Sequence, residues 1–406
     1  MTPYDYQSEL SEEAYAILCK HNIVYLAMEE RTGKTLTGLM TFEKSNQVQR
    51  IGVLTKKKAL PGWQKTLGET PWRNKEVALT NYHMAKNLVN VDALIIDEAH
   101  AYISAFPKPG VIWAQVKKLC AGKLIIFMSA TPNAQGRQML YHQFALSDYS
   151  PWKQYKNGYA WFDAYALRTK SGGVHKIYRN GLAINDYTKV QHDKIWDECK
   201  HLFITKTRKE LNFGQEPEDI VHWLELSAPS REAYNILVKD SVLNFTVGET
   251  SHKLICDSAM KLRMALHMLE GGVLKIDEDY IVLKLNEKID YILATWGDSE
   301  DVAIMYQYIA EGTKLRAVFK HAHILQGISY AEGIDLSHVK HLIIYSQDFS
   351  ASRHTQRRAR QANLNRTEPI KVHFLLVKKA LSHQVYTAVS LNKKNFVDSL
   401  FERNTL

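Results

Sequence analysis

Length, composition and charge set the first limits on this chain. It has 406 residues, of which 45% are hydrophobic and 23% are charged, a globular composition with enough apolar material for two or three domains. No apolar run reaches the roughly 20 residues of a membrane-spanning helix, and the polar, acidic N-terminus does not resemble a secretory signal. We therefore expect a cytoplasmic protein without a membrane partner. The formal charge of +9 fits a polyanionic partner, although a solvated basic surface would carry the same charge.

The first candidate site follows the apolar run IVYLA, which we predict to be a buried parallel strand. Residues 28–35, MEERTGKT, nearly match a phosphate-binding loop, because Gly33, Lys34 and Thr35 are in place. Met28 stands where the first glycine belongs. Apolar residues at helical spacing follow, so backbone N–H groups at a helix start would cradle phosphates. Lys34 would then reach the β- and γ-phosphates, and the Thr35 hydroxyl would bind Mg²⁺.

The second predicted strand, ALII, ends in the acidic pair Asp97 and Glu98. Hydrolysis of a Mg-nucleotide needs such a pair: Asp97 would hold the metal, directly or through water, and Glu98 would orient and deprotonate the attacking water. A strand followed by an acidic helix N-terminus is a common alternative. That alternative does not explain why both signals occur in this order, about 60 residues apart.

A third apolar run, KLIIFM, ends in the small polar sequence SATP. Ser129 and Thr131 would therefore follow a third strand. Ligands of open parallel sheets bind outside the carboxyl ends of the strands. We therefore expect the three motifs to meet at one edge of one sheet.

The segments RTGKT, DEAH and SATP resemble motifs I, II and III of superfamily 2 helicases and translocases, in the order and at the intervals of that family. The resemblance implies an α/β fold of two tandem RecA-like lobes, each a mainly parallel sheet flanked by helices, with the ATP site in the cleft between them. It also implies ATP and Mg²⁺ as cofactors, nucleotide contacts from Arg31 and Thr32, and coupling roles for Ser129 and Thr131. Gln7 resembles the glutamine that reads the adenine edge in this superfamily.

Two further segments resemble motifs Ia and Ib of the Swi/Snf-like branch, IGVLTKKKALPGWQKTL at 51–67 and ALTNYHMA at 78–85. Both motifs line the nucleic-acid track in that branch, and short polar or basic side chains suit contacts with phosphate. The expected DNA contacts of this lobe are Thr55, Lys56, Thr80 and Asn81. For Trp63 we favour packing in the core.

The second half of the chain resembles the same branch. Residues 203–240 follow its linker pattern, so we predict a first lobe at 1–208, a linker at 209–220 and a second lobe at 221–406. The apolar run VAIMY takes the position of motif IV. Alternating strands and helices predict a second α/β lobe with a parallel sheet.

Motifs V and VI of the resemblance supply the remaining site residues. Motif V would place Ser329 on the DNA and Gly333 in the coupling machinery, and motif VI begins at Gln356, a further coupling residue. The arginine that completes the ATP site from the second lobe is expected to be Arg360, with Arg357 as second choice.

The chain departs from the family pattern at one arginine of motif VI. Members carry a second arginine three residues after Arg360, where this chain has Asn363, and Arg366 could compensate. The chain shows no accessory domain or nuclease motif. This compactness is similar to that of small phage-encoded helicases, which would act in the host cytoplasm.

Together these features predict an ATP hydrolase that acts as a DNA helicase or translocase, in DNA replication, recombination or repair. The expected partner is single-stranded, forked or branched duplex DNA, and we expect a monomer. Two alternatives stay open at this point. One is an RNA helicase, because DEAH alone does not distinguish RNA from DNA. The other is a nucleotide-dependent DNA-binding switch that does not separate strands.

Overall fold

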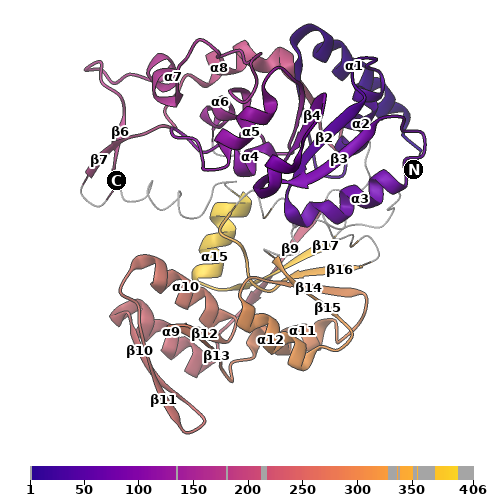
Figure 1. Ribbon diagram of the computed structural model, residues 1–406. Helices are drawn as coiled ribbons and strands as arrows, with labels where there is room; N and C mark the ends of the chain where they lie inside the picture. Colours follow the sequence, from indigo (N-terminus) through magenta and orange to yellow (C-terminus); the bar gives the residue numbers. More distant parts are fainter. Residues whose placement is uncertain are drawn as a thin grey trace. The chain divides into compact units, whose positions relative to one another are not determined.

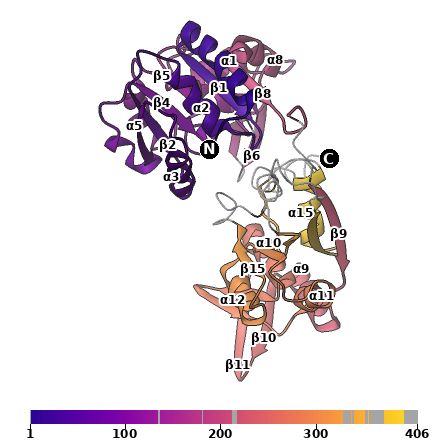
Figure 2. The same cartoon turned by 90° about the vertical axis from the view of Figure 1, so that its right-hand side faces the viewer.

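The computed structural model describes residues 2–133, 136–179, 182–211, 217–327, 336, 339–350, 354 and 371–391. The chain divides into two compact units, Met1–Phe213 and Gly214–Leu406 (Figures 1 and 2). Each unit has its own parallel sheet flanked by helices, which confirms the predicted fold class of two tandem α/β lobes. Within the described part of the chain, no helix is both long enough and apolar enough to cross a membrane.

The first unit is built around a six-stranded parallel sheet with the order β3-β2-β4-β5-β1-β8. The strands of this sheet are β1 (Ile23–Met28), β2 (Arg50–Thr55), β3 (Glu76–Asn81), β4 (Ala93–Asp97), β5 (Leu124–Met128) and β8 (Phe203–Lys206). The helices are α1 (Asp5–His21), α2 (Lys34–Glu43), α3 (Leu60–Gly68), α4 (Ala99–Tyr102), α5 (Trp113–Cys120), α6 (Leu140–Phe144), α7 (Gly158–Tyr165) and α8 (His192–Cys199). A separate antiparallel hairpin joins β6 (Lys176–Arg179) to β7 (Leu182–Asn185).

The central strands of the first sheet, β1, β2, β4 and β5, are buried on both faces, because helices cover each face of the sheet. Successive side chains of a strand point to opposite faces, and β1 shows the consequence. Val24 and Leu26 pack in a cluster with residues of α1 and α2, whereas Ile23 and Tyr25 pack in a cluster with residues of α4 to α8. This two-sided burial explains why the strands read as continuous apolar runs in the sequence.

The second unit contains a five-stranded parallel sheet with the order β15-β14-β16-β17-β9. These strands are β9 (Glu218–Leu224), β14 (Val302–Tyr306), β15 (His323–Gln326), β16 (His341–Ile344) and β17 (Lys371–Val377). The helices are α9 (Ala228–Asp240), α10 (Ala259–Glu270), α11 (Glu287–Thr295), α12 (Ile309–Val318) and α15 (Leu381–Tyr386), which a π-helical segment (Thr387–Leu391) continues. Two antiparallel hairpins, β10 (Val242–Val247) with β11 (Thr250–Ile255) and β12 (Val273–Ile276) with β13 (Asp279–Val282), complete it. The β10–β11 hairpin projects from the body of this unit in both views (Figures 1 and 2).

Among the described residues of the second unit, five charged side chains are buried: Glu270, Lys288, Glu311, Lys314 and Asp348. Glu270 accepts hydrogen bonds from the first backbone amides of α15, and Glu311 accepts from amides at the start of α12 and from a serine hydroxyl. Lys288 Nζ donates to the carbonyl of Tyr345 at 2.6 Å, and Lys314 Nζ donates to three backbone carbonyls. Burial raises the pKa of both glutamates and lowers the pKa of both lysines, to about 8 for Lys314. These groups join helices and loops of one lobe, so we interpret them as structural.

Three histidines on neighbouring strands of the second unit form a row. His373 Nδ1 lies 2.9 Å from His222 Nε2, and His373 Nε2 lies 3.1 Å from His341 Nδ1. Burial, followed by the charges of the two neighbouring imidazoles, lowers the pKa of His373 to about 3. Burial also lowers the pKa of His222 and of His341, so the three imidazoles are mainly neutral at physiological pH.

Candidate active site

The three predicted motifs lie at one edge of the first sheet. Strands β4, β5 and β1 are adjacent and parallel, so their carboxyl ends meet. The motif I loop leaves β1 after Met28, Asp97 is the last residue of β4, and Ser129 follows β5. The register places Asp97 beside Met128. The three segments therefore meet at one edge of the sheet of the first unit, as predicted.

The phosphate-loop candidate bends through two residues with left-handed backbone. Gly33 has φ 81° and caps the start of α2, and Arg31 has φ 64°. Left-handed backbone is natural for glycine and unfavourable for arginine. Gln7 packs directly on Gly33, since a Cβ atom at residue 33 would lie 1.8 Å from Gln7 Nε2. Gln7 is 2% exposed, and its Oε1 accepts from the amide of Tyr4 at 2.9 Å, so its amide group is held against the loop.

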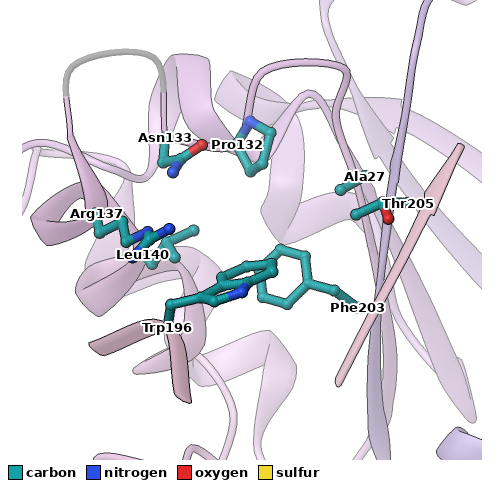
Figure 3. A pocket seen from close by; sticks show the side chains of 8 residues that line it. All are labelled: Ala27, Pro132, Asn133, Arg137, Leu140, Trp196, Phe203 and Thr205. Carbon is teal, nitrogen blue, oxygen red and sulfur yellow. The ribbon is translucent and has the colours of Figure 1, made fainter. Parts of the chain in front are cut away.

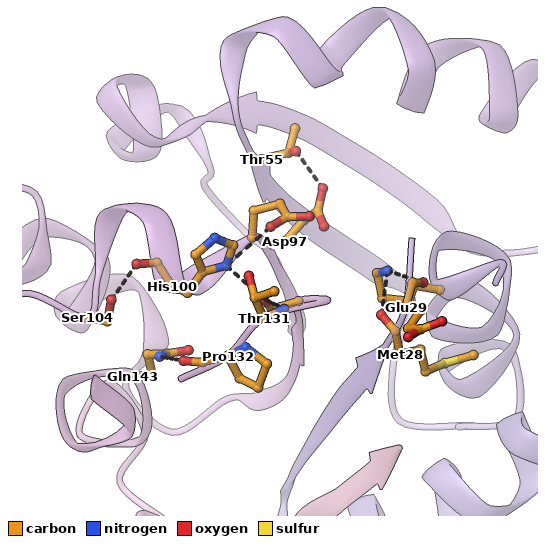
Figure 4. A network of polar contacts seen from close by, with 12 residues as sticks. Met28, Glu29, Thr55, Asp97, His100, Ser104, Thr131, Pro132 and Gln143 are labelled. Atoms are coloured by element: carbon orange, nitrogen blue, oxygen red, sulfur yellow. Dashed lines mark hydrogen bonds and ion pairs between the residues drawn. The ribbon is translucent and has the colours of Figure 1, made fainter. Parts of the chain in front are cut away.

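The ammonium group of Lys34 lies at the beginning of the same loop. Its Nζ donates to the carbonyls of Met28 and Glu29, at 2.8 Å each (Figure 4). The Thr32 hydroxyl donates to the same Glu29 carbonyl at 2.7 Å, and Thr35 follows on the first turn of α2, partly exposed. The Lys34 ammonium is thus held by neutral acceptors, which phosphate oxygens would outcompete because their negative charge adds an ionic attraction to the hydrogen bond.

The Asp97 carboxylate is buried, at 8% exposure. Two side chains donate to the same oxygen, Oδ2. Thr55 Oγ1 donates at 2.7 Å (Figure 4), and Trp63 Nε1 donates at 3.0 Å. Burial and the neighbouring charge of Glu98 raise the pKa of Asp97, and the hydrogen bonds from Trp63 and Thr55 and the positive charge of Lys34 oppose that rise.

Motif II is connected to motif III by a short polar chain. Glu98 has a left-handed backbone, φ 53°, and its amide donates to the carbonyl of Met128 at 2.8 Å. Its Oε2 lies 3.2 Å from His100 Nδ1, and His100 Nδ1 lies 2.7 Å from Ser129 Oγ. Ser129 Oγ also accepts from the amide of Thr131 at 3.0 Å. A change at Glu98 can thus reach the SATP segment through contacts of the described residues.

The predicted DNA contacts occupy the ends of β2, which neighbours β4, and of β3, which lies on the far side of β2. β2 pairs with β3 so that Thr55 lies opposite Asn81, and Lys56, Thr80 and Asn81 are partly exposed there. Thr55 differs from the expectation of an exposed phosphate contact. Its side chain is fully buried, because its hydroxyl serves the Asp97 carboxylate.

Other predicted site residues lie outside the part of the chain that the structure describes. These residues are Ser329, Gly333, Gln356, Arg357 and Arg360. Their roles in DNA contact, coupling and catalysis stay predictions.

Two groups near the site were not predicted from the sequence. The indole of Trp63, assigned to core packing, is indeed 4% exposed, but it also donates to Asp97. The Glu29 carboxylate accepts from the backbone amide of Arg208 at 2.8 Å, so the end of the first unit is attached to the phosphate loop. A general signal existed for Trp63, because a buried indole N–H usually finds an acceptor. The sequence offered no such signal for the pairing of Glu29 with Arg208.

A pocket of about 240 Å³ borders the site without containing Lys34 or Asp97 (Figure 3). It is lined by Ala27, Pro132, Asn133, Arg137, Leu140, Trp196, Phe203 and Thr205. The Arg137 guanidinium lies 5.3 Å from the centre of a Trp196 ring and donates to the carbonyl of His192 at 2.6 Å. The Arg137 guanidinium therefore already has partners within the first unit. We place the reactive site at the strand ends and not in this pocket.

The donor set at the strand ends fits a nucleotide-bound magnesium ion. Mg²⁺ prefers hard oxygen ligands and is usually held by one or two protein oxygens together with phosphates and waters. Asp97 offers a carboxylate oxygen, and Thr35 a hydroxyl on the first turn of α2. Among the described residues, no group of three or more histidine, cysteine or acidic side chains could hold a metal by itself. A metal at this edge would thus need oxygens from the nucleotide.

Comparison with known proteins gave matches among solved structures only. No protein-family model and no curated protein matches the chain. The Sulfolobus solfataricus SWI2/SNF2 ATPase core in complex with dsDNA is similar at 14% identity and TM-score 0.43, over 99% of this chain and 93% of that chain. The ATPase core domain from the same organism is similar at 15% identity and TM-score 0.44, over 98% and 92%. Geometry at the strand ends, and not these distant similarities, supports the function proposed below. The phage-type character predicted from compactness finds no support among them.

Proposed function

We propose that this protein is a DNA-dependent ATP hydrolase that couples hydrolysis to movement along DNA or to its unwinding. One observation carries the proposal: Lys34, Asp97 and Glu98 lie at or just beyond the carboxyl ends of β1 and β4, two parallel strands of one sheet. A phosphate-binding cation, a metal-binding carboxylate and a candidate base are the groups that phosphoryl transfer to water requires.

Each side chain has a separate task in this proposal. Lys34 exchanges its two carbonyl acceptors for the β- and γ-phosphates, and Gln7 presents its amide to the adenine edge. Asp97 and Thr35 would hold Mg²⁺, which would neutralise the charge of the phosphates. Glu98 orients the attacking water and takes its proton, while Arg31 and Thr32 shape the loop around the nucleotide.

Movement on DNA requires a track and a signal between track and site. We assign the track of the first unit to Lys56, Thr80 and Asn81, which cluster at the ends of β2 and β3. The polar chain from Glu98 through His100 to Ser129 and Thr131 would relay the state of the nucleotide. Contacts of this kind are mainly to phosphates, so binding should be independent of sequence and should weaken steeply with salt.

Hydrolysis also requires a positive charge that stabilises the transition state, which we assign to Arg360, with Arg357 second. Arg360→Ala should leave ATP and DNA binding nearly intact and lower turnover by about 10³-fold or more. Steady-state hydrolysis and DNA-binding titrations check this. An Arg360→Ala protein that instead loses DNA affinity and about one unit of salt slope would place Arg360 on the DNA track.

One experiment tests the function as a whole. Phosphate release from ATP is measured with single-stranded DNA, duplex DNA, forked DNA and RNA at equal nucleotide concentration, with Lys34→Ala protein as the background control. Stimulation by any of the DNAs above RNA supports the proposal. Stimulation by RNA alone would establish the RNA helicase instead, and DNA binding that depends on ATP without phosphate release would establish the binding switch.

A further inference from the structure

The segment between Thr55 and Trp63 is attached at both ends to one oxygen atom. Thr55 closes β2 and donates to Asp97 Oδ2 at 2.7 Å, and Trp63 on α3 donates to the same Oδ2 at 3.0 Å. Both anchors are buried, at 0% and 4% exposure. We call residues 55–63 the lysine bracket, because TKKKALPGW carries three consecutive lysines between its anchors.

The middle of the lysine bracket faces solvent. Lys57 and Lys58 are exposed and Lys56 is partly exposed. The turn is short and stiff, with a 3₁₀ segment at Lys57–Ala59 and a proline in the first turn of α3. Because helical backbone follows Lys56 without a break as far as Trp63, a displacement of the lysines would also displace the anchors.

The two anchors determine how Asp97 presents its carboxylate. Both hydrogen bonds to the carboxylate reach Oδ2, so they fix the rotation of the group and direct Oδ1 as the oxygen for a metal or its water. Partners that orient a ligating carboxylate commonly change metal affinity by about 10- to 100-fold when they are removed.

We propose that the lysine bracket is a coupling element in which Trp63 and Thr55 are positioning residues: phosphates of a nucleic acid bound at the lysines adjust the Asp97 carboxylate, and so the Mg²⁺ requirement of the nucleotide site. This inference rests on the proposed function. Nucleic acid bound at the lysines would act on the nucleotide site through the hydrogen bonds of Thr55 and Trp63 to Asp97 Oδ2.

The test measures how strongly nucleotide binding depends on Mg²⁺. Anisotropy of a fluorescent N-methylanthraniloyl ATP is followed during Mg²⁺ titration, with and without duplex DNA. Trp63→Phe removes the indole N–H and keeps an aromatic ring, and Thr55→Val removes the hydroxyl and keeps the shape. Trp152→Phe is the matched control, because Trp152 is also buried and donates its Nε1 to a carboxylate, Glu198, at 2.9 Å in the same unit.

We expect Trp63→Phe and Thr55→Val to raise the Mg²⁺ concentration for half-maximal binding about tenfold or more, and excess Mg²⁺ to restore binding. Binding of the free nucleotide in EDTA should match that of the wild type, and Trp152→Phe should leave the Mg²⁺ curve unchanged. In the wild type, duplex DNA should lower the Mg²⁺ requirement. Trp63→Phe should abolish this response without a change in DNA affinity.

The lysines supply the other half of the test. Lys57→Gln combined with Lys58→Gln should remove the effect of DNA on the Mg²⁺ curve, and adding Trp63→Phe should produce no further loss of that effect, as expected for residues that act as one unit. A wild-type Mg²⁺ curve that does not respond to DNA would overturn the coupling. So would Trp63→Phe and Thr55→Val curves that coincide with the wild type.

Failure of this inference is distinguishable from failure of the proposed function. If the wild type hydrolyses ATP under DNA stimulation while both anchor variants keep a normal Mg²⁺ response, only the bracket is wrong. If the wild type neither binds the nucleotide probe nor releases phosphate, the function itself is wrong. Thermal unfolding followed by circular dichroism identifies a variant that fails to fold, and in that case the other anchor variant decides.

Discussion

Both units of this protein hold lysine side chains away from bulk water. They differ in whether protein groups supply all of the partners of the ammonium group. In the second unit, Lys288 and Lys314 are buried among carbonyls, with Glu270 and Glu311 nearby. In the first unit, Lys34 is only partly buried and rests on two carbonyls at the mouth of a loop. The acceptors of Lys288 and Lys314 lie inside the protein and leave no place for a ligand. The two carbonyl acceptors of Lys34 can be replaced by oxygens of a ligand. A perturbed pKa alone therefore does not mark a catalytic group in this chain.

The largest expected effect separates the two kinds of lysine. Lys34→Ala should remove most nucleotide affinity and all DNA-dependent hydrolysis, a loss greater than the roughly 10²–10³-fold that one preorganised donor is worth. Its unfolding temperature should stay close to that of the wild type, because the lost hydrogen bonds join one loop to itself. Phosphate release and nucleotide binding check the first expectation, and calorimetry the second. Wild-type hydrolysis by Lys34→Ala would contradict the site.

Glu98→Gln should separate binding from chemistry at the same edge. The amide keeps the size and hydrogen-bonding capacity of the side chain but cannot take a proton, so hydrolysis should fall by about 10²–10⁴-fold. Mg-ATP binding should persist. Single-turnover hydrolysis with equilibrium nucleotide binding measures both quantities, and turnover within a few-fold of the wild type would show that Glu98 is not the base.

Lys288→Met should show the opposite profile to Lys34→Ala. Removing one member of a buried ionic group leaves the buried carboxylates Glu270 and Glu311 without its charge, which costs about 3–5 kcal/mol of stability. Nucleotide binding by molecules that remain folded should be unaffected. Urea unfolding of the wild type and Lys288→Met provides the comparison. A stable Lys288→Met protein that has lost nucleotide binding would contradict the interpretation of Lys288 as a structural residue.

The smallest expected effect concerns the histidine row of the second unit. The pKa of His373 is lowered to about 3 in the folded protein, against about 6.5 for an unperturbed histidine. Between these values the unfolded chain binds the extra proton, so the contribution of His373 to stability is present above pH 6.5. It is lost as the pH falls toward 3, by up to about 1.4 kcal/mol per pH unit. Unfolding of wild type and His373→Gln at pH 7, 6 and 5 should converge as the pH falls, and parallel curves would argue against a neutral buried His373.

Local pattern was sufficient for much of the fold. The predicted strands at 23–27 and 302–306 correspond to β1 and β14. A strand that is buried on both faces needs apolar residues at successive positions, so it can be recognised as an uninterrupted apolar run. The position of Asp97 at the end of β4 followed from the same pattern. In each case the information lies within a few neighbouring residues.

The partners of the motif residues could not be predicted in the same way. Trp63 is 34 positions from Asp97 along the chain, and Arg208 is 179 positions from Glu29. Such pairs depend on how β2, β4 and β8 are ordered in the sheet, which no local spacing encodes. The burial of Thr55 has the same origin, since a threonine that ends a strand can face either solvent or a neighbouring carboxylate.

The contact between Gly33 and Gln7 restricts which residues position 33 can tolerate. A side chain at position 33 would meet Gln7 Nε2 and would also have to adopt φ 81°. Shortening Gln7 would relieve the clash but not the backbone strain, which costs an alanine about 1–2 kcal/mol. No single second substitution at position 7 can rescue Gly33→Ala in full, so a library that varies both positions should retain glycine at 33 in its active members, whichever residue occupies position 7.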